Sequence, residues 1–155
     1  MHILFVCTGN TCRSPMAEAV ARAVAAERGL NDLTFASAGT NAAAGSSASD
    51  GALLVGMERG LDLSGHRSRP LTRAAVAEAD LILVMGEHHR DRAEALGGAG
   101  KTHLLTAFGP GAGAGRPVSD PFGGDLEVYR ATLEELDHEI RRAFEHLPRA
   151  ASDRS

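Results

Sequence analysis

The sequence predicts one α/β domain in which a four-stranded parallel sheet is covered by helices on both faces. Its 155 residues suffice for one compact domain with a sizeable core. Short apolar runs alternate with helical patterns along the chain, and this alternation is typical of βαβ units. The run LILVM at 81–85 is apolar throughout, as expected for a strand buried on both faces of such a sheet.

The four predicted strands lie at 3–6, 33–39, 81–85 and 102–106. The carboxyl ends of parallel strands meet at one edge of a sheet, and ligands bind beyond that edge. The residues that follow the first strand therefore lie where a binding site is expected.

The first predicted helix follows the first strand. Ser14 suits its N-cap and Pro15 its first turn, and the apolar stripe ends near Gly29. Further helices are predicted at 50–60, 71–80, 87–96 and from residue 125 onward. The last of these has apolar residues at spacings of three and four, which are Leu126, Tyr129, Leu133, Leu136, Ile140 and Phe144.

Two stretches are expected loops, the small-residue segment 41–49 and the glycine- and proline-rich segment 107–119. Loops as long as the second often carry function. We expect the domain to span residues 1–147 and the tail, 148–155, to be disordered.

Composition excludes several classes of protein. With 16 basic and 20 acidic residues the net charge is −4, which argues against a nucleic-acid binder. The apolar runs are shorter than the roughly 20 residues that span a bilayer, and the N-terminus MHILFVC lacks the features of a signal peptide. The two cysteines, Cys7 and Cys12, lie five apart beside a turn, a pattern that favours a reducing cytoplasm over a secreted disulfide scaffold. The sequence does not indicate an oligomeric state, so we expect a monomer.

The most informative stretch is VCTGNTCRSP, which leads from the first strand through a glycine-containing turn into a helix. Converging backbone N–H groups and the positive end of the helix form a cradle for an anion. Cys7 would lie at the bottom of this cradle as a thiolate, and Arg13 adds a planar fork that matches two phosphoryl oxygens. These are the groups needed to attack phosphorus. The alternative is a buried cysteine at a strand end and a surface arginine.

Asp120 is the candidate general acid. It stands in SDPFGGD at 119–125, and Pro121 biases it toward an extended backbone that projects its side chain. From the residues alone, this segment is more typical of a simple turn before a helix.

VCTGNTCRSPMAEA closely resembles the signature loop of the low-molecular-weight protein tyrosine phosphatases. Asp120, Pro121 and Phe122 match the late Asp-Pro-aromatic motif of that family, and the resemblance covers residues 1–147. It implies a flavodoxin-like strand order and phosphorylated proteins as substrates. No cofactor and no metal are expected, because the amide nest and Arg13 take the place of a metal.

The resemblance implies a role for each residue of the site. Cys7 is the nucleophile, Arg13 clamps the transition state, and Asp120 protonates the leaving group and later takes a proton from water. Ser14 donates a hydrogen bond to the Cys7 thiolate; the simpler interpretation is an N-cap, and both roles can hold at once. The residues expected around the phosphoryl group are Thr8, Gly9, Asn10, Thr11, Cys12, Arg13 and Ser14.

Three further residues are expected to support the loop. Asn10 adopts a left-handed conformation, and Ser37 and His66 brace it, unless His66 is an exposed loop residue. Cys12 forms a protective disulfide with Cys7, unless it only packs in the loop.

The substrate class depends on Thr11 and Phe122. Tyrosine-specific members of the family commonly have an aliphatic residue at the position of Thr11 and an aromatic pair after Asp-Pro, whereas this chain has Phe122-Gly123-Gly124. At these positions, CTGNTCRS and DPFGG, the sequence resembles the bacterial protein arginine phosphatases of the same fold. Phosphoarginine is therefore the favoured substrate, and phosphotyrosine is the alternative.

Two other classes of function fit the sequence less well. A thioredoxin-coupled arsenate reductase would need further cysteines after Cys12, and the sequence has none. A phosphopeptide-binding module would not need both Cys7 and Asp120.

The stretch ALGGAGKT at 95–102 follows a helix and precedes a strand, which is the reverse of a nucleotide P-loop. EHHRD at 87–91 is read as a solvated helix face and not as a metal site.

Overall fold

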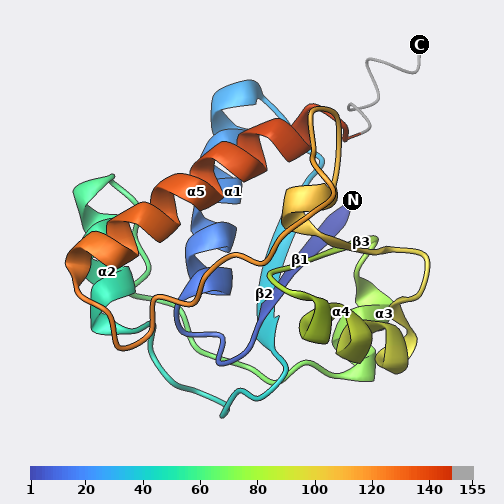
Figure 1. Ribbon diagram of the computed structural model, residues 1–155, viewed down its shortest axis with the longest axis horizontal. Helices are drawn as coiled ribbons and strands as arrows, with labels where there is room; N and C mark the ends of the chain where they lie inside the picture. The colour runs from blue at the N-terminus through green and yellow to red at the C-terminus, as the bar shows by residue number, and fades with distance from the viewer. Residues whose placement is uncertain (148–155) are drawn as a thin grey trace.

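The computed structural model describes residues 1–147 and has a parallel four-stranded sheet between two layers of helices (Figure 1). The strands are β1 (His2–Cys7), β2 (Thr34–Gly39), β3 (Leu81–Val84) and β4 (Thr102–Leu104). Their order, β2-β1-β3-β4, is the flavodoxin-like order that was expected. The tail at 148–155 lies outside the described residues. Among the helices of residues 1–147, none is long and apolar enough to cross a membrane.

Each face of the sheet has its own layer of helices, as predicted. One layer consists of α1 (Arg13–Arg28), α2 (Asp50–Glu58) and α5 (Leu126–Phe144), and the other of α3 (Arg73–Glu78) and α4 (Glu87–Ala93). Figure 1 shows α5 lying along α1 on one side of the sheet and α3 and α4 together on the other.

The central strand β1 is buried on both faces. Ile3, Phe5 and Cys7 belong to the apolar core beneath α1 and α5, whereas Leu4 and Val6 belong to the core beneath α3. This alternation follows from the two-residue period of a strand. It turns Cys7, the last residue of β1, toward the N-terminus of α1.

The neighbours of β1 continue onto the loop that follows it. Thr40 N donates to Cys7 O at 2.9 Å, and Asn41 N donates to Thr8 O at 2.9 Å. Gly39 pairs with Cys7 in the sheet, and a Cβ at Gly39 would collide with the Thr8 carbonyl oxygen. Only glycine therefore lets β2 pass so close to the loop.

The start of α1 differs from the prediction. Cys12, and not Ser14, occupies the N-cap position, so Ser14 lies inside the first turn with its hydroxyl free for other contacts. The prediction for the other end is confirmed, because Gly29 ends α1 in a left-handed conformation with φ of 66°.

Several other elements are shorter than predicted. The helices expected at 50–60 and 71–80 end at Glu58 and Glu78. The helix expected at 87–96 is regular from Glu87 to Ala93 and continues as an irregular turn to Gly98, in which Gly97 leaves the helical region with a φ of 109°. The strand expected at 102–106 ends at Leu104 and continues as a short 3₁₀ turn.

The glycine-rich turn before β4 does not resemble a nucleotide-binding loop. Lys101 Nζ donates to the carbonyl oxygens of Val76 and Ala79 at 2.7 and 2.6 Å. It thereby satisfies the C-terminal end of α3, as a basic side chain at a helix C-terminus commonly does.

Candidate active site

Cys7 lies at the carboxyl end of β1 and is buried. Its sulfur is 3.0 Å from the Ser14 hydroxyl oxygen, and the Asn10 side-chain nitrogen donates to the same oxygen at 2.8 Å. The Asn10 amide nitrogen can only donate, so Ser14 accepts from Asn10 and keeps its own proton for Cys7. A hydrogen bond of this direction stabilises a thiolate.

Asn10 is fully buried and has the left-handed conformation that was expected, with φ of 56°. Its side-chain nitrogen also donates to Ser37 Oγ at 3.0 Å, and its side-chain oxygen accepts from the Arg69 backbone N–H at 2.9 Å. His66 Nε2 donates to the Asn10 carbonyl oxygen at 2.6 Å. The structure thus brings both predicted bracing residues, Ser37 and His66, into contact with Asn10.

Arg13 is buried and directed at the same centre. Its Nη1 donates to Val118 O at 2.8 Å, and its Nη2 lies 3.5 Å from Thr8 Oγ1 and 3.7 Å from Asp120 Oδ2. Within residues 1–147 the buried Nε of Arg13 has no hydrogen-bond partner. A buried donor without an acceptor is costly, so this nitrogen indicates that an anion completes the site.

These groups surround one pocket of about 190 Å³. Its lining residues are Cys7, Thr8, Gly9, Thr11, Cys12, Arg13, Asp120 and Phe122. Asp120 is half exposed, and its Oδ1 accepts from the Phe122 backbone N–H at 3.0 Å. Phe122 is 74% exposed at the rim. The pocket therefore combines a buried thiol, a guanidinium and a carboxylic acid that reaches solvent.

Val118 is a contributor that the sequence did not reveal. It lies in the long loop before α5, its N–H donates to Met85 O at 2.8 Å, and its carbonyl accepts from Arg13. The loop expected at 107–119 thus helps to hold the guanidinium. A main-chain acceptor has no signature in a sequence.

Cys12 is buried on the side of the loop that faces α5. Its sulfur lies 3.3 Å from Ser49 Oγ and 3.4 Å from the Tyr129 hydroxyl oxygen. Burial raises the pKa of Tyr129, and the hydrogen bond to Cys12 adds to the increase. Cys7 and Cys12 are both free thiols in this structure.

His89 is the second contributor that the sequence analysis missed. The prediction of a solvated face is right for His88 but wrong for His89, which is fully buried on α4. His89 Nε2 lies 2.8 Å from Thr8 Oγ1. Burial lowers the pKa of His89 to about 3, with smaller contributions from His88 and Arg13. The available signal was position, since His89 closely follows a buried strand at the edge where Cys7 lies.

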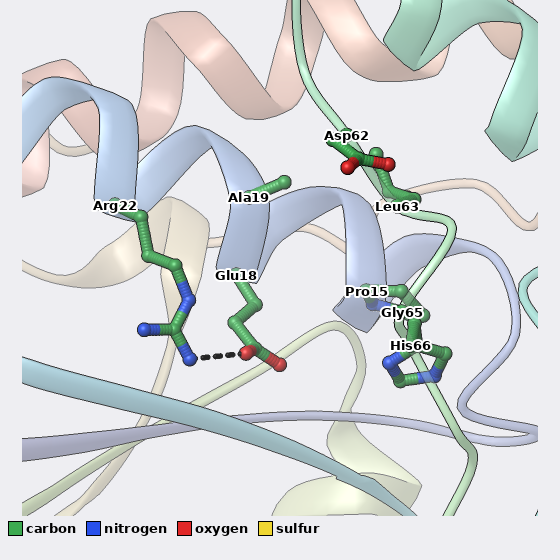
Figure 2. A pocket seen from close by; sticks show the side chains of 8 residues that line it. All are labelled: Pro15, Glu18, Ala19, Arg22, Asp62, Leu63, Gly65 and His66. Atoms are coloured by element: carbon green, nitrogen blue, oxygen red, sulfur yellow. Dashed lines mark hydrogen bonds and ion pairs between the residues drawn. The ribbon is translucent and has the colours of Figure 1, made fainter.

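A second cavity, of about 220 Å³, lies between α1 and the segment 62–66 and does not include Cys7 (Figure 2). Figure 2 shows Glu18 and Arg22 of α1 paired with each other and His66 beside Pro15. The Glu18–Arg22 ion pair has a length of 2.6 Å. His66 thus connects this surface to the Asn10 carbonyl.

Comparisons with known proteins agree with this geometry. The family model described as low molecular weight phosphotyrosine protein phosphatase matches residues 2–153. A protein-arginine-phosphatase of Bacillus subtilis is 37% identical over 147 residues, 95% of this chain and 97% of that protein. The low molecular weight protein-tyrosine-phosphatase PtpB of Staphylococcus haemolyticus is 37% identical over 141 residues, 88% of this chain and 92% of that protein.

Among solved structures, the chain is similar to that of the arginine phosphatase YwlE, determined as a mutant with a phosphorylated active-site serine. The TM-score is 0.87 at 37% identity, and the match covers 94% of each chain.

Proposed function

Because the chain belongs to the low molecular weight phosphotyrosine protein phosphatase family, we propose that it hydrolyses phosphoarginine in proteins through a phosphocysteine intermediate. The observation that carries the chemistry is one pocket that gathers the Cys7 sulfur, the Arg13 guanidinium and the Asp120 carboxylate. We further propose that it acts in the reducing cytoplasm, where a free Cys7 thiol remains reactive.

In the first step the Cys7 thiolate attacks phosphorus, and an S–P bond forms as the P–N bond of phosphoarginine breaks. The leaving guanidine nitrogen takes its proton from Asp120, which is half exposed and within reach of the pocket. Arg13 stabilises the charge that spreads over the phosphoryl oxygens, and its unpartnered Nε is one of the donors.

In the second step water attacks the phosphocysteine. Asp120, now ionised, takes a proton from this water, the S–P bond breaks, and inorganic phosphate and the Cys7 thiolate are released. The hydrogen bond from Ser14 to Cys7 stabilises the thiolate both as the initial nucleophile and as the final leaving group.

Two features support phosphoarginine as the substrate. Thr11 lines the pocket, so its hydroxyl can hydrogen-bond to a polar guanidine where an aliphatic side chain could not. In addition, a relative that is named a protein-arginine-phosphatase is similar to this chain over nearly the whole length of both proteins.

Phosphotyrosine is the second candidate, and Phe122 favours it. This ring stands exposed at the rim of the pocket, where it could pack against an aryl group. A relative named a protein-tyrosine-phosphatase is equally similar in identity.

The deciding experiment compares kcat/KM for a phosphoarginine peptide and a phosphotyrosine peptide in the wild-type protein and in Thr11→Ile. We expect the wild type to prefer phosphoarginine and the variant to lose or reverse this preference. Thr34→Ile, at the opposite end of the sheet, is the matched control and leaves the preference unchanged. A wild-type preference for phosphotyrosine would make the chain a tyrosine phosphatase, and activity on neither would favour an arsenate reductase or a phosphopeptide-binding module.

A further inference from the structure

Thr8 lies in the wall of the pocket between Arg13 and His89. Arg13 Nη2 is 3.5 Å from Thr8 Oγ1, and His89 Nε2 is 2.8 Å from the same oxygen. A guanidinium has no lone pair to offer, so the Thr8 oxygen is the acceptor in its contact with Arg13. The direction of the contact with His89 depends on which ring nitrogen carries the proton.

The surroundings of His89 decide its tautomer. The ring is fully buried and neutral, since its pKa is lowered to about 3. Within the described part of the chain, its Nδ1 is buried without a hydrogen-bond partner. A buried N–H without an acceptor is rarer and more costly than a buried lone pair without a donor. The proton is therefore on Nε2, and His89 donates it to Thr8 Oγ1.

We propose that His89 is a positioning residue that directs the Thr8 hydroxyl proton at a phosphoryl oxygen in the Cys7 pocket. Thr8 Oγ1 accepts from Arg13 and from His89, so the remaining hydrogen-bonding capacity of the hydroxyl is its own O–H. Thr8 lines the pocket together with Cys7, and an anion bound there receives this O–H as a further donor. The inference rests on the proposed phosphoryl chemistry but is independent of the choice between phosphoarginine and phosphotyrosine.

Neutrality of His89 is part of this arrangement. A protonated ring would place a second cation beside Arg13, which already lowers the pKa of His89. A neutral ring orients Thr8 without repelling the guanidinium. The histidine thus influences the phosphoryl group through Thr8 and not through a charge of its own.

The test measures the Kd of inorganic phosphate by titration calorimetry and kcat/KM for p-nitrophenyl phosphate. We expect His89→Phe, which keeps the ring but removes the donor, and Thr8→Val each to weaken phosphate binding about fivefold to tenfold. The double variant binds no more weakly than Thr8→Val alone, because His89 acts through the hydroxyl. His138→Gln, on the exposed side of α5, is the control and binds phosphate as the wild type does.

A pair of amides separates hydrogen bonding from packing. Gln places its amide N–H near the position of Nε2, whereas the shorter Asn does not reach Thr8, so we expect His89→Gln to restore affinity to within about twofold and His89→Asn not to. This pair also decides the matter if His89→Phe does not fold.

Additive losses in the double variant, or equal affinity in the Gln and Asn variants, would overturn the role of His89. Absence of p-nitrophenyl phosphate hydrolysis by the wild type would instead overturn the proposed phosphatase function. The phosphate affinities would still decide the role of His89, so the two failures are distinguishable.

Discussion

The Ser14 hydroxyl oxygen lies between the Cys7 sulfur, at 3.0 Å, and the Asn10 side-chain nitrogen, at 2.8 Å. Since Asn10 donates to Ser14, the Ser14 proton is directed at the sulfur. The Cys7 sulfur thus accepts from a hydroxyl whose orientation is set by a buried amide.

Replacing Ser14 by Ala should therefore make Cys7 less reactive. We expect Ser14→Ala to slow alkylation of Cys7 by iodoacetamide at pH 6 by about tenfold, because a charge-assisted hydrogen bond to the thiolate is lost. The rate is followed by mass spectrometry of the labelled protein. Ser64→Ala, on the exposed segment before His66, serves as the control. Equal rates in the wild type and Ser14→Ala would show that Ser14 does not stabilise the thiolate.

Substitutions of Asn10 should separate backbone strain from hydrogen bonding. Asn10→Ala loses the contacts to Ser14, Ser37 and the Arg69 N–H and keeps a Cβ at a φ of 56° without the hydrogen bonds that offset its strain. We expect a loss of about 3 kcal/mol in the free energy of unfolding, measured with urea. Asn10→Gly loses the same contacts without the Cβ, so it should be about 1 kcal/mol more stable than Asn10→Ala. Equal stabilities would assign the whole effect to the hydrogen bonds.

The role of Asp120 as an acid predicts a dependence on the leaving group. We expect Asp120→Asn to lower kcat/KM, which reports only the steps up to the phosphocysteine, by about 10²- to 10³-fold for poor leaving groups such as alkyl phosphates. For p-nitrophenyl phosphate, whose leaving group needs little protonation, the loss should be much smaller. Asp125→Asn, at the N-cap of α5, is the control. The same loss for every leaving group would indicate that Asp120 acts mainly through its contact with Arg13.

The proposed redox role of Cys12 is testable with hydrogen peroxide. Peroxide oxidises the Cys7 thiolate to a sulfenic acid and is itself reduced to water. The Cys12 thiol then condenses with this sulfenic acid, which releases water and forms a disulfide. We expect wild-type activity to return fully with dithiothreitol and Cys12→Ser to lose at least half of its activity irreversibly. In the disulfide Cys12 gives up its contacts with Ser49 and Tyr129, so fluorescence of Tyr129, the only tyrosine, should report the change. Full recovery in Cys12→Ser would remove this role.

The buried, neutral His89 predicts a fold that is sensitive to acid. Its pKa is about 3 in the folded protein, against the ordinary value of 6.5 in the unfolded chain. Above pH 6.5 neither state binds the proton, and His89 adds no pH dependence. Between pH 6.5 and about 3 only the unfolded chain binds the proton, so the free energy of unfolding decreases as the pH is lowered. His89 contributes at most about 1.4 kcal/mol to this decrease for each pH unit.

Urea unfolding at pH 7, 6 and 5 checks this expectation. His89→Gln lacks the group that titrates, so its stability should fall less steeply than that of the wild type. The lowered pKa of His103, which results mainly from burial, contributes equally to both proteins. Parallel pH dependences would show that His89 binds its proton equally well in both states.

The sequence was sufficient for the features that depend on neighbouring residues. The Cys7–Arg13 loop is contiguous, so the strand before it and the helix after it already indicate an anion cradle. The ends of elements were harder, because the pattern of apolar residues does not show where a glycine such as Gly97 leaves the helical region. Ser14 is not a cap because α1 begins at Arg13, and its hydroxyl oxygen accepts instead from the Asn10 side chain, a contact that only the folded turn makes.

His89 and Val118 show what tertiary packing adds. His88 and His89 are neighbours and look alike in the sequence. The packing of α4 in the folded protein buries His89 and leaves His88 exposed. The partner of Val118 O lies 105 positions away at Arg13, and a carbonyl makes this contact whatever its side chain.

The contacts of Asn10 also bear on when the chain becomes reactive during its synthesis. The ribosome makes the signature loop first, yet the partners of Asn10 include Ser37, His66 and the Arg69 N–H, which belong to much later parts of the chain. Closing such long loops is slow compared with forming a local turn. A nascent chain that ends before residue 69 thus carries Cys7 in a loop whose left-handed turn is not yet held by Ser37, His66 and the Arg69 N–H. The arrangement of the signature loop around Cys7 is therefore a property of the completed fold and not of the loop sequence alone.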